Sequence, residues 1–206
     1  IGHYVGAKRV REVVRCSPDL GVKYLTIFAF STENWKRPKH EVDGLMDLFC
    51  QHCPRIKSHC LGKGYRAKVV SSDFDMLPEH VRKQFGELEK ATEHCKKLTL
   101  NICVSYGGRS EILRAVRQMA QRAADGTIVP KSIKESDIDR LMLTDGTPDP
   151  EIVIRTSGEY RLSNFLLWQV AYSEMIFVNK HWPELTEEDF VGILHQYNQR
   201  KRRFGK

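Results

Sequence analysis

Two arginines and a serine stand close together late in the chain, at Arg155, Arg161 and Ser163. Arg155 ends a short apolar run, a polar turn with glycine follows, and Ser163 opens another apolar run. We therefore expect a strand, a loop and the start of a helix. Arginine presents a planar fork of donors that matches phosphate oxygens, and a helix N-terminus also favours anions. The spacing predicts a phosphate or diphosphate site.

Two further polar segments follow apolar runs in the same way. Residues 31–37, with the sequence Ser-Thr-Glu-Asn-Trp-Lys-Arg, come after the run 24–30, and Gly107-Gly108-Arg109 follows the run 98–104. Open α/β sheets bind their ligands outside the carboxyl ends of the strands. We therefore expect the three polar loops to lie at one edge of the sheet and to share a cleft.

Short apolar runs alternate with amphipathic stretches along the chain, which is typical of strands joined by helices. The predicted strands cover residues 24–30, 65–70, 98–104, 152–155 and 175–178. The predicted helices cover residues 5–16, 41–59, 79–94, 110–124, 133–143 and 163–172. Ser110 is expected to cap one helix, and a capping box at Thr186 is expected to open the last. The expected fold class is α/β, a single domain over residues 1–206 with a central, mainly parallel sheet flanked by helices.

The charge of the chain narrows the classes of partner. Its 33 lysines and arginines against 26 acids give a formal net charge of +7, which suits nucleic acid, an anionic membrane surface or phosphorylated small molecules. Basic and acidic residues alternate through most helices, and only residues 200–206 are densely basic. Because no helix shows a basic stripe on one face, we do not expect nucleic-acid binding. No apolar run approaches the ~18–20 residues of a membrane span.

Six cysteines are present, at positions 16, 50, 53, 60, 95 and 103. Their low density in a chain of 206 residues favours reduced thiols over a disulfide framework. Cys50, His52 and Cys53, followed by His59 and Cys60, invite a zinc interpretation. The helical spacing separates the two groups by about two turns, so a structural role is the favoured interpretation.

Three segments resemble the cis-prenyltransferases, the family of undecaprenyl diphosphate synthase and dehydrodolichyl diphosphate synthase. They are residues 29–38 (Ala-Phe-Ser-Thr-Glu-Asn-Trp-Lys-Arg-Pro), residues 101–109, which end in Tyr-Gly-Gly-Arg, and residues 154–169, from Ile-Arg-Thr-Ser-Gly-Glu to Leu-Leu-Trp-Gln. The resemblance runs from Gly2-His3 to residues 203–205. It covers essentially the whole chain.

The resemblance implies an enzyme that adds isopentenyl diphosphate units in Z configuration to an allylic diphosphate such as farnesyl diphosphate. The product would be a long-chain polyprenyl diphosphate for a glycosyl carrier lipid. The resemblance also implies Mg²⁺, an apolar product tunnel, and a homodimer or a heterodimer with a related subunit. The lipid tail implies peripheral contact with a membrane, in the cytoplasm or on the cytosolic face, which would be the endoplasmic reticulum in a eukaryote.

The family's functional residues carry over onto matching positions. Arg155, Arg161 and Ser163 resemble residues that bind isopentenyl diphosphate, and Glu174 resembles an acidic Mg²⁺ ligand. The segment with Ser31, Asn34, Trp35 and Arg37 resembles a mobile loop that closes over substrate, and His3 resembles a histidine near the allylic diphosphate. Arg203 and Gly205 resemble a tail that reaches the partner's active site. Asn34, Arg37 and His3 are the expected catalytic residues.

The resemblance departs at its start, because the family opens with a strand and an Asp-Gly-Asn loop that bind the allylic diphosphate and Mg²⁺. Nothing like that loop precedes Ile1, so we expect the domain to be N-terminally incomplete and the chain alone to lack the catalytic acid. The alternative is a non-catalytic partner subunit of a heteromeric enzyme. A smaller departure is Ser72, where the family more often has glycine. Product length and the type of carrier lipid stay open.

Overall fold

Eight of the nine residues of the strand β3 (Leu98–Tyr106) are buried, and Thr99 is the exception. In the computed structural model, β3 lies between β1 (Tyr24–Ser31) and β2 (Tyr65–Val70), and both run parallel to it. Strands buried on both faces form continuous apolar runs in the sequence, and β3 is such a strand. The structure describes residues 2–200, with side chains from residue 6 onward.

The chain divides into two compact units, each of which contains one parallel sheet. The three-stranded unit comprises residues 24–148 and 164–168, and the two-stranded unit comprises residues 1–23, 149–163 and 169–206. The sequence predicted one central, mainly parallel sheet. The strand pairing is parallel, as predicted, but the five strands are divided between a three-stranded and a two-stranded sheet.

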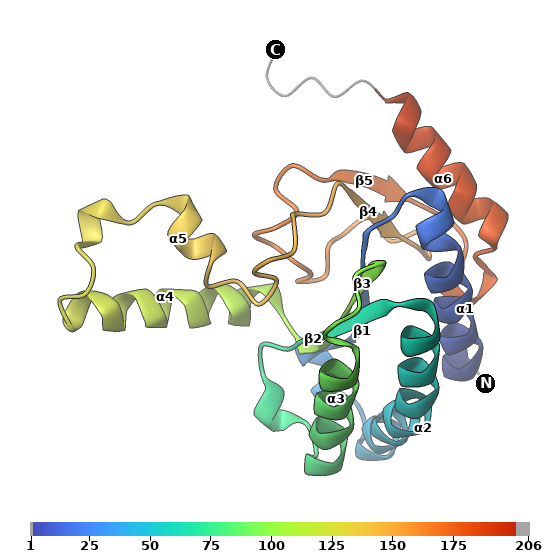
Figure 1. The fold of residues 1–206 in the computed structure, drawn as a ribbon, viewed down its shortest axis with the longest axis horizontal. Helices are drawn as coiled ribbons and strands as arrows, with labels where there is room; N and C mark the ends of the chain where they lie inside the picture. Colours follow the sequence, from blue (N-terminus) through green and yellow to red (C-terminus); the bar gives the residue numbers. More distant parts are fainter. Residues whose placement is uncertain (1, 201–206) are drawn as a thin grey trace. The chain divides into compact units, whose positions relative to one another are not determined.

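Helices cover the three-stranded sheet. The helices α2 (Lys39–Lys63) and α3 (Glu79–Thr92) run side by side and pack against β2 (Figure 1). The helix α4 (Gly108–Ala124) and the short helix α5 (Glu135–Asp139) enclose a second apolar cluster. Buried residues of that cluster are Ala115, Met119, Leu141 and Met142. All four helices were expected, although α5 is shorter than the predicted 133–143.

Side chains from α3 satisfy the outer edge of β2. Thr92 Oγ1 accepts a hydrogen bond from the Ala67 N–H at 3.0 Å, and Glu89 Oε1 accepts one from the Val69 N–H at 2.8 Å. Covering an edge in this way removes an open template for strand pairing. The opposite outer strand, β1, has Phe30 as its one buried residue.

The two-stranded unit holds β4 (Ile152–Arg155) and β5 (Glu174–Phe177), which pair in register from Ile152 with Glu174 to Arg155 with Phe177. The helices α1 (Gly2–Cys16) and α6 (Glu187–Gln199) pack against each other in this unit. Its apolar core contains Ile176, Leu185 and Ile193. The capping box predicted at the start of α6 is confirmed, because Thr186 Oγ1 accepts a hydrogen bond from the Asp189 N–H at 3.1 Å.

Two predictions about helices are wrong. Residues 163–172 form turns and not a helix, since Ser163, Asn164 and Leu166 have left-handed backbones with φ of 52°, 64° and 43°. Consecutive left-handed residues cannot continue a right-handed helix. The apolar run that suggested a helix packs as a turn. Ser110 is also not a helix cap, because α4 begins at Gly108 with Gly107 as its N-cap.

Candidate functional site

Ser105, fully buried near the end of β3, connects the loops that follow β1 and β2. Its hydroxyl accepts a hydrogen bond from Trp35 Nε1 at 2.9 Å and donates one to the carbonyl oxygen of Asp73 at 2.9 Å. The carboxyl ends of these three strands therefore lie at one edge, as parallel pairing requires. The predicted proximity of the loops after β1 and β3 is confirmed. The loop after β4 belongs to the two-stranded unit, so its place in a shared cleft stays a prediction.

Ser31 and Asn34 hold the loop after β1 in one conformation. Asn34 Oδ1 accepts a hydrogen bond from the Ser31 N–H at 2.8 Å, which closes the first turn of a short 3₁₀ helix over Thr32–Lys36. Arg37 ends that turn and pairs with Glu41 Oε1 at 2.7 Å on the surface. Of the two predicted catalytic residues in this loop, Asn34 thus caps a turn and Arg37 sits in an exposed ion pair.

Trp35 is anchored and not free. Besides its bond to Ser105, its ring meets the ring of Phe30 edge-on, with centroids 4.9 Å apart. Both contacts favour a defined ring position. The residue expected to close over substrate is therefore already placed by the fold.

Asn164 fastens the start of α4 to the loop after β1. Its carbonyl oxygen and its Oδ1 accept hydrogen bonds from the backbone N–H groups of Gly108 and Arg109, at 2.7 and 2.9 Å. Its Nδ2 donates to Glu33 Oε1 at 2.8 Å. Burial alone would raise the pKa of Glu33, but the hydrogen bonds from Asn164 and its neighbours lower it overall.

The pair Gly107-Gly108 allows this close approach. A Cβ at Gly107 would lie 2.6 Å from Thr32 Oγ1 and 2.7 Å from Asn164 Nδ2, and a Cβ at Gly108 would lie 3.0 Å from the backbone nitrogen of Leu167. Real Cβ atoms do not tolerate such distances. The sequence indicated a break after the strand, whereas the steric need for two glycines became visible only in the fold.

Arg155 stands at the carboxyl end of β4, as predicted. Its Nη2 lies 3.4 Å from Ser163 Oγ, a long contact, and its Nε is buried without a hydrogen-bond partner among the described residues. Buried donors of this kind are uncommon in folded proteins. Arg155 and Ser163, two of the three predicted diphosphate contacts, are brought together here, with donor capacity left over.

Arg161 lies on the exposed part of the same loop and pairs with the carboxylate of Glu159. The turn before it is tight, since Ser157 and Gly158 have φ of 71° and 63°. Tyr160 is 70% exposed and its ring lies 5.0 Å from that of Phe177. The second guanidinium thus has a local anionic partner that a bound phosphate would have to replace.

Glu174 opens β5, opposite Ile152, whereas Arg155 is opposite Phe177 at the other end of the pair. The two positions are three residue steps apart along the strands, which is about 10 Å. Glu174 Oε2 accepts a hydrogen bond from Arg200 Nη1 at 3.0 Å. Within this unit the structure therefore does not bring the expected metal ligand next to Arg155.

Three predicted site residues lie outside what the structure describes. The backbone of His3 belongs to α1, but its side chain is not described, and Arg203 and Gly205 fall in the undescribed residues 201–206. Their expected roles stay predictions.

A buried pair that the sequence did not indicate lies where β3 meets α4. Glu111 is fully buried, and its two oxygens accept hydrogen bonds from the Tyr106 hydroxyl at 2.5 Å and the Leu143 N–H at 2.7 Å. Burial, with the neighbouring Glu111 charge, raises the pKa of Tyr106 well above its usual range. The rings of Phe28 and Phe165, stacked at 4.6 Å, surround this tyrosine.

None of the six cysteines is in a disulfide, as expected. Burial raises the pKa of Cys53 to about 12 and that of Cys60 to about 11, so both stay protonated at neutral pH. Over the described residues, no three histidine, cysteine or acidic side chains are grouped so that they could hold a metal ion. Neither the cysteines and histidines around Cys50 nor Glu174, the expected Mg²⁺ ligand, belongs to such a group.

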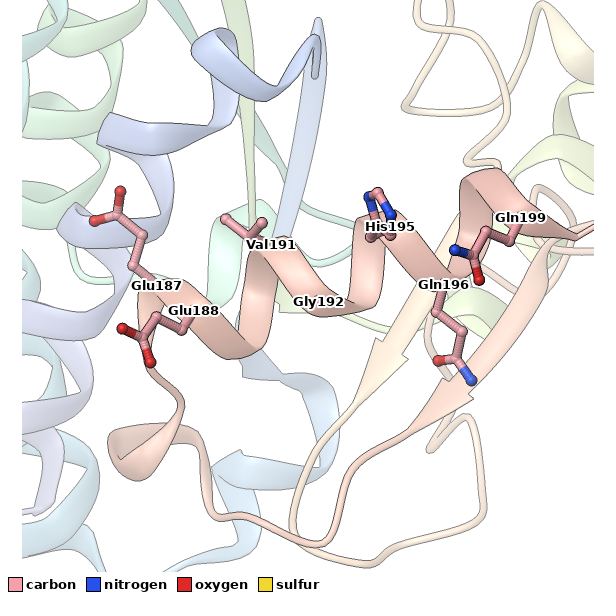
Figure 2. A pocket seen from close by; sticks show the side chains of 7 residues that line it. All are labelled: Glu187, Glu188, Val191, Gly192, His195, Gln196 and Gln199. Atoms are coloured by element: carbon pink, nitrogen blue, oxygen red, sulfur yellow. The ribbon is translucent and has the colours of Figure 1, made fainter.

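An open hollow of about 800 Å³ lies along α6 (Figure 2). All seven lining residues come from that one helix, and none is a predicted site residue: Glu187, Glu188, Val191, Gly192, His195, Gln196 and Gln199. A one-sided surface of this kind does not form a catalytic cleft. In the part of the chain that the structure describes, no helix combines the length and apolar character needed to cross a membrane.

Comparison with known proteins agrees with the arrangement of strands and loops. The family profile described as putative undecaprenyl diphosphate synthase matches residues 1–205. A Micrococcus luteus ditrans,polycis-undecaprenyl-diphosphate synthase, (2E,6E)-farnesyl-diphosphate specific, is 43% identical over 99% of this chain and 82% of its own length. A Thermococcus kodakarensis tritrans,polycis-undecaprenyl-diphosphate synthase, geranylgeranyl-diphosphate specific, is 44% identical over 100% of this chain and 78% of its own.

Solved structures show the same similarity. Lavandulyl diphosphate synthase from Lavandula x intermedia, in complex with dimethylallyl diphosphate, superposes with a TM-score of 0.94 at 31% identity, covering 100% of this chain and 88% of that one. A probable undecaprenyl diphosphate synthase from Campylobacter jejuni gives 0.85 at 32% identity, covering 98% and 93%. These relatives are named as synthases, which does not support the alternative of a non-catalytic partner subunit. The chain belongs to the undecaprenyl diphosphate synthase family of cis-prenyltransferases.

Proposed function

We propose that the chain adds isopentenyl diphosphate units, in Z configuration, to an allylic diphosphate such as farnesyl diphosphate. The product is a long-chain polyprenyl diphosphate that serves as a glycosyl carrier lipid. Membership of the family supports the reaction class. The names of two relatives differ in the allylic diphosphate, farnesyl in one and geranylgeranyl in the other, so the starter unit is a matter for experiment.

The observation that carries the proposal is the state of Arg155. Its Nε is buried and unpaired among the described residues, and its Nη2 is only loosely placed against Ser163 Oγ at 3.4 Å. A guanidinium with spare donors gains most from an anion that offers several oxygens. We assign the isopentenyl diphosphate head group to Arg155 and Ser163, with Arg161 released from Glu159 to join them.

The chemistry that follows is electrostatic. The isopentenyl double bond attacks the allylic carbon as the bond from that carbon to the diphosphate oxygen breaks, and a proton is lost from the new unit. Diphosphate leaves with both electrons of the broken bond, so nearby cations stabilise the transition state. Arg155 acts by holding the attacking substrate in place, and Trp35 acts by excluding water, with Asn34 and Arg37 beside it in the loop after β1.

Mg²⁺ is the proposed metal, and Glu174 is its proposed protein ligand, because a carboxylate oxygen suits this hard cation. The described residues fit it poorly, since Arg200 pairs with Glu174 and no group of three or more histidine, cysteine or acidic side chains that could hold a metal includes it. No step above therefore passes through the metal. We expect the ion to arrive with the diphosphates, which supply phosphate oxygens of their own.

The proposed assembly is a homodimer or a heterodimer with a related subunit, in contact with a membrane surface in the cytoplasm or on the cytosolic face. An exposed apolar pair on α4 supports association, since Leu113 and Val116 are three residues apart and 47% and 52% exposed. Light scattering of the wild type and of Leu113→Lys tests it. A monomeric wild type would contradict the dimer.

The reaction is tested by incubating the full-length protein, including any segment that precedes Ile1, with labelled isopentenyl diphosphate, Mg²⁺ and, in separate arms, farnesyl, geranylgeranyl or dimethylallyl diphosphate. We expect long-chain product from farnesyl diphosphate, and about 10–100-fold less with Arg155→Ala, since hydrogen bonds to a charged group contribute about 1.5–3 kcal/mol. Arg15→Ala is the control, because Arg15 has only a surface ion pair with Glu187. Equal activity of Arg155→Ala and wild type would refute the assignment.

A further inference from the structure

Ser105 has a backbone conformation that serine seldom adopts. Its φ is 46°, in the left-handed region, although it is fully buried and followed by Tyr106 and not directly by a glycine. Side chains with a Cβ enter that region only where surrounding contacts compensate the steric cost. The hydrogen bonds of Ser105 therefore indicate its role.

Hydrogen bonds from two other loops end on Ser105. Its hydroxyl donates to the Asp73 carbonyl oxygen at 2.9 Å and accepts from Trp35 Nε1 at 2.9 Å. Its own carbonyl oxygen accepts from the Asp73 N–H at 3.1 Å and from the Ser71 hydroxyl at 3.2 Å. Since the single hydroxyl proton is committed to Asp73, a lone pair is left pointing at the indole N–H. The orientation of the acceptor for Trp35 is thus fixed from the loop after β2.

Ser72 adds a second tie to the same place. Its hydroxyl accepts a hydrogen bond from the Gly107 N–H at 3.0 Å, two residues beyond Ser105. A glycine at position 72 would have no side chain with which to accept it. This chain therefore links the loop after β2 to the end of β3 through two serine hydroxyls.

We propose that Ser105 is a positioning residue for Trp35. Without its hydroxyl, the indole N–H loses its acceptor and the ring keeps only the edge contact with Phe30. The loop over Thr32–Lys36 then has to be ordered by the substrate, and the free-energy cost of that ordering weakens the binding affinity. The inference rests on the proposed function in one respect, that Trp35 faces the substrate.

The first test needs no activity. In the full chain labelled with ¹⁵N-tryptophan, the three indole N–H signals belong to Trp35, Trp168 and Trp182, and Trp35→Phe identifies the first. In Ser105→Ala we expect the Trp35 signal to shift and its hydrogen to exchange about 2–10-fold faster, the value of one hydrogen bond. The other two signals should not change. Unaltered exchange at Trp35 would overturn the proposal.

Two further variants keep the test decisive. Ser105→Gly removes the same hydroxyl but relieves the left-handed backbone, so it serves if Ser105→Ala folds poorly and should give the same change at Trp35. Ser132→Ala is the matched control, since Ser132 is exposed in a 3₁₀ turn and its hydroxyl contacts only the Val129 carbonyl. A change at Trp35 in the control would show that the signal does not report on Ser105.

The second test uses catalysis. Ser105→Ala should raise the KM for a diphosphate substrate several-fold while kcat falls less, because a loop that is disordered in the free enzyme weakens binding first. A fall in kcat with KM unchanged would contradict positioning by Ser105. If the full-length wild type, including any segment that precedes Ile1, transfers no prenyl group, the proposed function fails, and the indole exchange still decides whether Ser105 places Trp35.

Discussion

The loop after β1 and the loop after β4 carry similar polar residues but satisfy them differently. In the first, Trp35 and Glu33 bond to Ser105 and Asn164, which are 70 and 131 residues away. In the second, Arg161 bonds to Glu159 two residues away, and Arg155 to Ser163 eight residues away at 3.4 Å. One loop is held by distant parts of the fold, and the other leaves its cations available.

The difference follows from charge and burial. A guanidinium gains more from an anion than a neutral donor such as an indole does, because hydrogen bonds between charged groups are stronger. A buried neutral donor needs a permanent partner. A guanidinium close to solvent tolerates an incomplete set of partners until an anion arrives. We conclude that the conformation of the loop after β1 is fixed before a ligand binds. The loop after β4 instead presents cationic side chains whose hydrogen bonds a bound anion completes. Four predictions test this contrast, from the largest expected effect to the smallest.

Of the four changes, Glu111→Ala should lower the stability most. It should hardly affect the cationic groups that are available to bind an anion. It leaves the buried Tyr106 hydroxyl and the partly buried Leu143 N–H without their partner, and a buried group left without its partner costs about 1–3 kcal/mol. We expect the free energy of unfolding, measured by urea titration, to fall by about 3 kcal/mol. Glu87→Ala, which removes an exposed acid on α3, is the control. A loss no larger than that of the control would show that the buried pair is not a stabilising element.

Arg155→Lys should separate binding from stability at the other loop. Lysine keeps the charge but cannot present a fork, so product formation should fall about tenfold, or about 1.4 kcal/mol. The free energy of unfolding should change by no more than about 0.5 kcal/mol. A large loss of stability instead would mean that Arg155 is part of the packed scaffold and that the contrast between the loops is wrong.

Asn164→Ala should behave like a lost helix cap. It removes the Oδ1 acceptor for the Arg109 N–H and the donor to Glu33, and lost caps cost about 1 kcal/mol. Asn164→Asp keeps the acceptor but places a second carboxylate beside Glu33. Its deficit should shrink as the pH is lowered and the acids are protonated. Thermal unfolding at pH 3 and pH 7 measures both variants, and a deficit of Asn164→Asp that is identical at the two pH values would count against the Glu33 contact.

Asp189→Asn should give the smallest change in stability, and the change should be confined to acidic pH. Hydrogen bonds from Lys180 and Thr186 lower the pKa of Asp189 to about 2, below the ~3.9 of an unfolded aspartate. The folded state therefore binds its proton more weakly, so the stability is present above pH 4 and is lost as the pH falls toward 2. Unfolding midpoints between pH 2 and pH 5 should fall less steeply in Asp189→Asn than in Glu188→Gln, which removes a neighbouring acid of the same helical turn. Equal slopes would contradict the cap.

Much of the local structure could be predicted from the sequence. The apolar runs at 65–70 and 152–155 are strands with the expected limits, and the capping box at Thr186 opens α6. These features depend on periodicity and on contacts within one helical turn, which neighbouring residues determine by themselves. The position of Arg155 at a strand end could be inferred in the same way, whereas the family was inferred from the resemblance of three segments to the cis-prenyltransferases.

Tertiary contacts decided the rest. The apolar run after Ser163 looked helical, but Asn164 has a left-handed backbone and accepts hydrogen bonds from the first N–H groups of α4. This close contact requires glycine at positions 107 and 108. The partner of Trp35 is a serine 70 residues away. Such pairings have no signal in the sequence because a hydroxyl or an amide can bond to almost any donor, and only packing determines which donor it meets.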